Sequence, residues 1–133
     1  MISCISRRVA MATPKLYITP QYMFSSSSLL RTEIENSIQS NKVLVFSKTY
    51  CPYCDAAKDT LSNITPPAEV VELDTLDDGA ERQAILATIS GQRTVPNIFI
   101  DGKHLGGNSD LQTASKNGNL KELLDGANVK HDF

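Results

Sequence analysis

The sequence has 133 residues, which suits one compact domain with a tail. Hydrophobic residues make up 41% of it, and no apolar stretch approaches the roughly 20 residues of a membrane-spanning helix, so a transmembrane protein is excluded. The net charge is −2, but residues 33–133 hold 9 basic and 15 acidic side chains, and this acidic body argues against nucleic-acid binding, which depends on Lys and Arg contacts to phosphates.

Residues 1–29 differ from the rest in composition and are predicted to be a disordered leader. Residues 1–30 contain six serines, four of them consecutive at 25–28, and neither an acid nor a glycine. With Arg7 and Arg8 near the start, this composition is typical of a mitochondrial transit peptide, and the apolar run of a secretory signal is missing. The alternative is a leader without a targeting signal, so we expect the protein in the mitochondrion, in the cytoplasm or in both.

The folded body is predicted to begin near residue 29 with a helix. Thr32 and Glu35 have the spacing of a capping box, although a start one turn earlier, at Ser28, fits equally well. The apolar face of this helix comprises Leu30, Ile34 and Ile38.

A short apolar run at 43–47 follows and predicts a strand buried on both faces. A helix is expected directly after it, from the Cys-x-x-Cys pair to the helix-breaking run Thr65-Pro66-Pro67. Residues 70–73 indicate a second strand. Because the order strand, helix, strand implies a right-handed crossover, these two strands should be parallel.

The next predicted helix has Asp78 as its cap, Glu81 at the box position and Gly91 as its terminator. Strands at 98–100 and 103–105 flank Asp101-Gly102, a strong signal for a two-residue hairpin. Two helices close the chain, the first opened by Ser109 and ended by Gly118, the second opened by Asn119.

The pair Cys51 and Cys54 lies where strand 43–47 ends and a helix begins. A helix N-terminus presents unpaired N–H groups and about half a positive charge, which stabilise a sulfur there as the reactive thiolate. Pro52 favours the first helical position, so Cys51 becomes the cap and Cys54 the third helical residue. Lys48 adds a nearby cation. Cys51 is therefore predicted to attack a disulfide, and Cys54 to resolve the mixed disulfide that forms.

Three cysteines, two of them in a Cys-x-x-Cys pair, indicate a redox or metal motif rather than a secreted disulfide framework. A zinc site would need two further ligands. The candidates are Cys4, His104 and His131, whose spacings match no zinc pattern, so no metal is expected. Cys4 is interpreted as a bystander and His104 as a surface side chain that is not a catalytic base.

Three motifs go beyond the bare cysteine pair. They are Thr49-Tyr50-Cys51-Pro52-Tyr53-Cys54, Thr94-Val95-Pro96-Asn97 and Gly106-Gly107-Asn108-Ser109-Asp110. In this order and separation they resemble the dithiol glutaredoxins, fungal members most of all, over roughly residues 30–125. Thioredoxins instead carry a Trp before the pair, and this sequence has none.

The resemblance implies an α/β domain with the thioredoxin-like fold over residues 30–127, followed by a tail at 128–133. Its four-stranded mixed sheet has a parallel β-α-β half and an antiparallel closing hairpin, and helices flank it. The resemblance also implies a cis bond between Val95 and Pro96, facing the cysteines. From the residues alone, a trans proline opening an edge strand is the alternative.

The resemblance further implies glutathione as co-substrate and indicates its contacts. They are Lys48 and Gln92 at the glycine carboxylate, Cys51 at the sulfur, Tyr53 beside the tripeptide, Val95 and Pro96 along the cysteinyl backbone, and Ser109 and Asp110 at the γ-glutamyl end. Ser109 and Asp110 open a helix, whose N–H groups can bind that carboxylate. The alternatives are an ordinary cap for Ser109 and a solvated surface for Lys48 and Gln92.

The expected activity is a glutathione-dependent thiol–disulfide oxidoreductase that acts as a monomer on protein–glutathione mixed disulfides and protein disulfides. One alternative is a module that binds a [2Fe–2S] cluster through Cys51 and glutathione. Pro52 argues against it, because the family pattern associates cluster binding with small residues there. The other alternative is a general protein disulfide reductase of the thioredoxin type.

Overall fold

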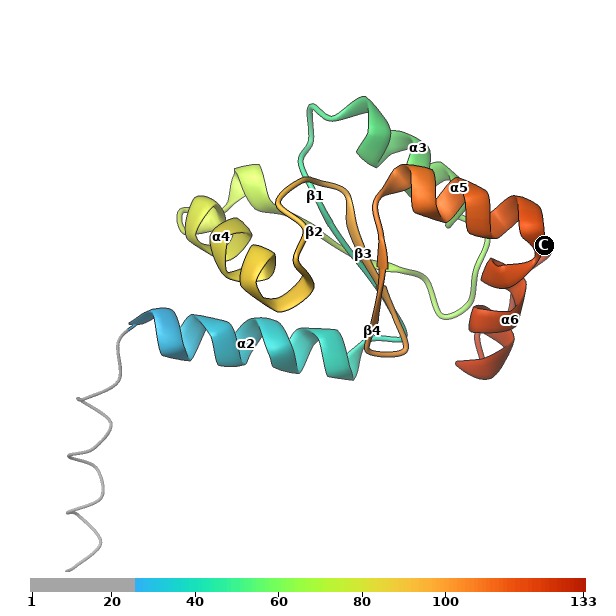
Figure 1. The fold of residues 1–133 in the computed structure, drawn as a ribbon, viewed down its shortest axis with the longest axis horizontal. Helices are drawn as coiled ribbons and strands as arrows, with labels where there is room; N and C mark the ends of the chain where they lie inside the picture. Colours follow the sequence, from blue (N-terminus) through green and yellow to red (C-terminus); the bar gives the residue numbers. More distant parts are fainter. Residues whose placement is uncertain (1–25) are drawn as a thin grey trace, which may run out of the picture.

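The computed structural model describes residues 26–133 and confirms the predicted order of elements (Figure 1). The helices are α2 (Ser26–Ser40), α3 (Pro52–Thr60), α4 (Gly79–Ser90), α5 (Asn108–Asn117) and α6 (Asn119–Gly126), with a short 3-10 helix, η2 (Leu73–Thr75). The strands are β1 (Val43–Ser47), β2 (Glu69–Glu72), β3 (Asn97–Ile100) and β4 (Lys103–Gly106). None of the helices in this part of the chain is long and apolar enough to cross a membrane.

The four strands form one mixed sheet in the order β2-β1-β3-β4. Strand β2 runs parallel to β1, with Val45 opposite Val70. Strands β3 and β4 are antiparallel to their neighbours, and Val45 faces Ile98 on the other side of β1. The parallel β-α-β half and the antiparallel closing hairpin are therefore both confirmed, and β1, which leads to the cysteines, is a central strand.

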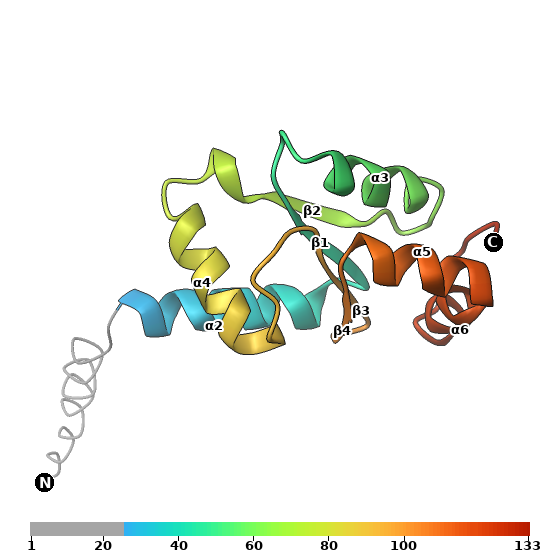
Figure 2. The same cartoon turned by 45° about the horizontal axis from the view of Figure 1, so that its top comes forward.

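Two separate cores cover the two faces of the sheet, and alternate residues of β1 contribute to each. Val43 and Val45 join the first core, under α3, α5 and α6, and Leu44 and Phe46 join the second, against α2 and α4 (Figures 1 and 2). The first core also contains Ala57, Leu61, Ile64, Ile98, Ile100, Leu111, Ala114, Leu120, Leu124, Ala127 and Val129, and the second contains Leu30, Ile34, Ile38, Leu73, Leu86 and Phe99.

The start of α2 corrects the predicted capping box. The helix already begins at Ser26, and the Thr32 hydroxyl donates to the Ser28 carbonyl at 3.1 Å, as an interior residue does. Contacts with α4 accompany the extra turn, since the Ser27 hydroxyl donates to Glu81 at 2.8 Å and the Arg31 guanidinium donates to Thr88 at 2.8 Å.

Helix α4 has the predicted cap residue and terminator but not the predicted side-chain bonds. Asp78 precedes the helix, yet its carboxylate accepts from Arg82 Nε at 2.8 Å instead of capping a backbone N–H. Gly91 ends the helix with φ +78°, a conformation that suits glycine.

In the hairpin between β3 and β4, Asp101 and Gly102 both have positive φ, as a tight two-residue turn requires.

Two other boundaries differ from the prediction. Helix α3 ends at Thr60, well before Pro66, and a turn completes the segment. Helix α5 begins at Asn108 with Gly107 as its cap, so the prediction that Ser109 opens it is wrong. Gly118, with φ +86°, ends α5 as predicted, and α6 begins at Asn119, also as predicted.

The C-terminal segment also packs on the domain. Val129 is buried in the first core, and Lys130 exchanges two backbone hydrogen bonds with Thr65, at 2.9 and 2.7 Å. Residues 1–25, the greater part of the predicted leader, lie outside the described residues.

Candidate functional site

The sulfur of Cys51 lies at the N-terminus of α3, as predicted. Cys51 is the cap residue with extended backbone, Pro52 is the first helical residue, and the Cys54 N–H donates to Cys51 Sγ at 3.3 Å. The Cys51 N–H in turn donates to the Lys48 carbonyl at 3.2 Å, which closes the turn between β1 and α3. The side chain of Cys51 is half-buried and that of Cys54 fully buried, and both are free thiols.

The inner cysteine has the environment of a protonated thiol. Burial, with a smaller contribution from the hydrogen bond to Cys51, raises the pKa of Cys54 to about 11. Contacts with Lys48 and Ser47 act in the opposite direction and are weaker. At neutral pH Cys54 therefore keeps its proton, and of the two sulfurs only Cys51 is at the helix terminus and open to an incoming disulfide.

A loop from the other side of the sheet faces this sulfur. The Val95–Pro96 bond is cis, so the alternative of a trans proline opening an edge strand is wrong. The carbonyl oxygen of Val95 lies 3.9 Å from Cys51 Sγ. Pro96 is buried and leads into the central strand β3, so the cis-proline loop is fixed by the sheet at the position opposite the nucleophile.

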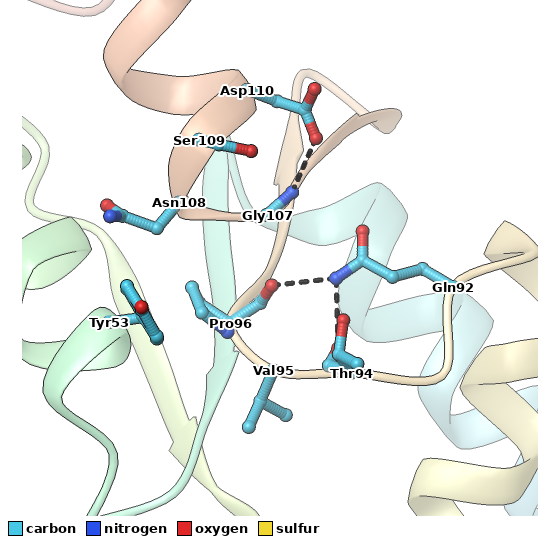
Figure 3. Close-up of a pocket in the computed structure, with 9 residues that line it drawn as sticks. All are labelled: Tyr53, Gln92, Thr94, Val95, Pro96, Gly107, Asn108, Ser109 and Asp110. Carbon is cyan, nitrogen blue, oxygen red and sulfur yellow. Dashed lines mark hydrogen bonds between the residues drawn. The ribbon is translucent and has the colours of Figure 1, made fainter.

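A pocket of about 630 Å³ opens beside this loop (Figure 3). It is lined by Tyr53, Gln92, Thr94, Val95, Pro96, Gly107, Asn108, Ser109 and Asp110. Six of the eight residues predicted to contact glutathione thus come together. Cys51 is not among the lining residues but lies next to Val95, and Lys48 is not among them either.

Three lining residues were missed at the sequence level: Thr94, Gly107 and Asn108. All three belong to motifs already recognised in the sequence, so the signal was present. What the sequence does not give is which residues of these motifs face the pocket, because that depends on how the cis-proline loop and the start of α5 come together. Asn108, the first residue of α5, points toward the side of the pocket where Tyr53 lies (Figure 3).

The start of α5 forms one wall of the pocket. The Asp110 carboxylate reaches back and accepts from the Gly107 N–H at 3.0 Å, so Asp110 caps its own helix. Gly106, just before it, has φ +131°, and a Cβ there would lie 2.1 Å from an oxygen of Asp110. Only glycine fits at this position. Ser109 is exposed beside the cap, and its side chain does not cap the helix as predicted.

The side-chain amide of Gln92 is hydrogen-bonded to the protein backbone. Its side-chain nitrogen donates to the carbonyls of Thr94, at 2.9 Å, and Pro96, at 2.8 Å (Figure 3). Gln92 therefore lines the pocket while it holds two carbonyls of the cis-proline loop in place.

Lys48 lies in the loop between β1 and Cys51, which is tied to η2. The carboxylate of Asp74 accepts from the backbone N–H of Thr49, at 3.0 Å, and from its hydroxyl. These two bonds, with the Lys48 charge as a weaker cause, lower the pKa of Asp74. The segment that leads to Cys51 is thus tethered to η2 through Thr49.

Residues 26–133 hold no group of three His, Cys, Asp or Glu side chains that could bind a metal ion. His131, one of the zinc candidates, instead lies 2.7 Å from the carboxylate of Asp125. Cys4 lies outside the described residues.

Comparison with known proteins agrees with this geometry. A family model described as glutaredoxin matches residues 43–105. Glutaredoxin-1 of Saccharomyces cerevisiae is 49% identical over 96 residues, covering 69% of this chain and 87% of the yeast protein. A glutaredoxin of Ricinus communis is 50% identical over 93 residues, covering 70% of this chain and 91% of the plant protein.

Solved structures give the same result for the fold. Oxidised glutaredoxin 2 from Chlamydomonas reinhardtii superposes with a TM-score of 0.70 at 42% identity, over 77% of this chain and 96% of that one. A buckwheat glutaredoxin–glutathione complex superposes with a TM-score of 0.70 at 37% identity, over 77% of this chain and 93% of that one.

Proposed function

Because this chain belongs to the glutaredoxin family, we propose that Cys51 is its attacking thiol, that Cys54 is its resolving thiol, and that the pocket beside them binds glutathione. Membership at 49% and 50% identity to curated glutaredoxins makes the chain a glutathione-dependent thiol–disulfide oxidoreductase.

In the first step the Cys51 thiolate attacks the glutathione sulfur of a mixed disulfide between glutathione and a target protein. The original S–S bond breaks, a Cys51–glutathione disulfide forms, and the target sulfur leaves as a thiolate that takes a proton from water. The thiolate of a second glutathione then attacks the bound glutathione sulfur, which releases glutathione disulfide and regenerates the Cys51 thiolate.

The observation that carries this assignment is the placement of Cys51 Sγ between a helix terminus and the cis-proline loop. The Cys54 N–H points at the sulfur from 3.3 Å and favours negative charge on it. The Val95 carbonyl, 3.9 Å away, lies where the backbone of an incoming glutathione would pair with the loop.

Cys54 acts only when the substrate is a protein disulfide. Attack by Cys51 then leaves the target attached to Cys51. Cys54 displaces it by closing the Cys51–Cys54 disulfide, and because Cys54 is protonated at neutral pH, its proton passes to the departing target sulfur as the new bond forms. Two glutathione molecules reduce the closed pair again.

The residues around the pocket support the proposed glutathione-binding site. The N-terminus of α5 offers N–H groups to the γ-glutamyl carboxylate, and the exposed Asp110 carboxylate lies beside it for the ammonium group. Tyr53, 68% exposed, covers the other side. Lys48 and Gln92 would serve the glycine end, Lys48 by its charge and Gln92 by the loop it holds. A structural relative, the buckwheat protein, was solved as a glutaredoxin–glutathione complex.

We further propose that the protein is a monomer without a resident metal, and that its substrates are glutathionylated or disulfide-containing proteins. We also propose that residues 1–29 direct it to the mitochondrion, with the cytoplasm as the alternative. Expression of the full chain and of residues 30–133, each fused to a fluorescent protein, separates the two compartments. Absorbance of anaerobically purified protein tests for a cluster.

The proposed roles are tested by a glutathione-coupled assay on a small glutathione mixed disulfide. Cys51→Ser should abolish turnover, and Cys54→Ser should retain it, because the two-step route above does not use Cys54. In a single turnover of the pre-reduced proteins on a protein disulfide, without glutathione, the wild type should release reduced target and both variants should fail to do so. Loss of mixed-disulfide turnover in Cys54→Ser would overturn the assignment of the two sulfurs.

A further inference from the structure

The orientation of the Gln92 side chain can be deduced from its partners. Thr94 and Pro96 both present carbonyl oxygens to the Gln92 amide, at 2.9 and 2.8 Å. Carbonyls accept hydrogen bonds and cannot donate, so the amide nitrogen must face them and the amide oxygen must point away. A flipped amide would place three acceptors together. The side-chain oxygen of Gln92 is thereby directed toward strand β4.

The partner of that oxygen is His104, whose Nε2 lies 3.2 Å from Gln92 Oε1. Because Oε1 is an acceptor, the imidazole must carry a hydrogen on Nε2. Partial burial lowers the pKa of His104, and the negative charge of Asp110 opposes this shift less strongly. The ring is therefore neutral at pH 7, in the tautomer with its proton on Nε2.

His104 is itself held by the sheet. It lies opposite Phe99 in the β3–β4 ladder, and the two rings pack with centroids 5.3 Å apart at 53°. The backbone of Gln92 is fixed as well, since its N–H donates to the Ser90 hydroxyl at 3.1 Å, which also accepts from the Asn97 side chain at 3.0 Å. The chain of bonds therefore runs from a rigid strand, through Gln92, to the cis-proline loop.

We propose that His104 is a positioning residue for the mixed-disulfide reaction: its Nε2–H ties the Gln92 amide, which holds the Thr94 and Pro96 carbonyls, to strand β4, and so sets the cis-proline loop opposite Cys51. The inference rests on the proposed function, because the loop is taken to be the edge with which glutathione pairs. His104 is not itself among the residues that line the pocket, and it reaches the pocket through its bond to Gln92, which is.

The consequence should appear in substrate affinity. Without the His104 donor, the Gln92 amide keeps its bonds to the two carbonyls but loses its link to β4, so the two carbonyls are held less firmly. The Val95 backbone between them is then less well ordered for pairing with glutathione, while Cys51 keeps its own contacts on α3. The KM for a glutathione mixed disulfide should rise, and kcat should change little.

Two variants and a control make this measurable. His104→Phe keeps a ring against Phe99 but removes the donor, and it should raise the KM for a small glutathione mixed disulfide about fivefold, the usual effect of one neutral hydrogen bond. His104→Gln restores a donor at the same reach and should return KM toward the wild-type value. Lys103→Gln, on the adjacent exposed position of β4, should leave both KM and kcat unchanged.

The proposal is overturned if His104→Phe keeps the wild-type KM, or if His104→Gln and His104→Phe have the same KM.

A second measurement needs no variant. The 15N chemical shifts of the His104 ring in the wild-type protein should show the proton on Nε2 at pH 7, and a proton on Nδ1 would contradict the deduction. If wild type and Lys103→Gln turn over with glutathione, the proposed function stands whichever result His104 gives.

Discussion

The two cysteines of the pair lie one helical turn apart in different surroundings. Cys51 receives a backbone N–H at the open end of α3, whereas Cys54 is completely buried. Burial of the second sulfur raises its pKa to about 11, above the ordinary thiol value of 9.0. The sequence predicted the positions of both sulfurs on the helix, because position relative to a helix start can be deduced from Pro52 and the preceding strand.

The raised pKa of Cys54 implies a pH dependence of stability. The folded state binds this proton more tightly than the unfolded state, so the stabilisation is complete below pH 9 and is lost as the pH rises through about 11. Urea unfolding of the reduced protein at several pH values should show the loss, and Cys54→Ala should lack that component. An identical alkaline slope in both proteins would contradict the assigned shift.

Other residue-level features could not be deduced from the sequence. The sequence does not reveal that the amide nitrogen of Gln92 bonds to two backbone carbonyls. His104 was interpreted as a surface side chain and is exposed, yet it bonds to Gln92. Sequence motifs identify residue types, whereas the partner of an amide depends on a rotamer and on a cis peptide bond that bring distant segments together.

At the level of elements, the entry to α5 joins the fold to the pocket. Gly106 has a φ of +131° and lies against the Asp110 carboxylate that caps the helix. Gly106→Ala should therefore cost about 1–3 kcal/mol of unfolding free energy and raise the KM for the mixed disulfide, because the cap must move. Gly126→Ala is the matched control, since a Cβ there meets nothing within 4 Å. Equal stability of the two variants would show that the α5 entry tolerates a side chain.

The tether between η2 and the loop before Cys51 is a second such element. Asp74 holds both the N–H and the hydroxyl of Thr49, two residues ahead of the nucleophile. Asp74→Ala should free this loop and slow alkylation of Cys51 severalfold, whereas Asp77→Ala, an exposed acid on the same connection, should not. Alkylation at the wild-type rate in Asp74→Ala would mean that the tether does not order the nucleophile.

Element order and sheet pairing were predictable because hydrophobic periodicity and the Asp101-Gly102 turn signal them directly. Element ends were less so. Thr32 and Ser109 have the chemistry of caps but lie inside their helices, whereas α6 begins at Asn119 as predicted. Contacts with α4 accompany the longer α2, and the Asp110 carboxylate holds the start of α5. Neither cause can be deduced from local spacing.

For the whole molecule, the central sheet separates two apolar cores that share no side chain. Leu44 is completely buried in the second core and Leu124 in the first, on opposite faces. Each Leu→Ala change should cost about 2–5 kcal/mol, and the double variant should be additive within about 0.5 kcal/mol. Chemical denaturation measures all three, with Leu29→Ala, at a position 56% exposed, as the control. A coupling well above this value would show that strain passes through the sheet.

In the proposed reaction it is glutathione, and not the target protein, that becomes attached to Cys51. This can be tested by intact-mass and peptide mass spectrometry of Cys54→Ser, quenched with acid during reaction with a glutathionylated peptide. We expect glutathione on Cys51 and free peptide thiol in solution. The target peptide joined to Cys51, or an unmodified Cys51 beside consumed substrate, would contradict it.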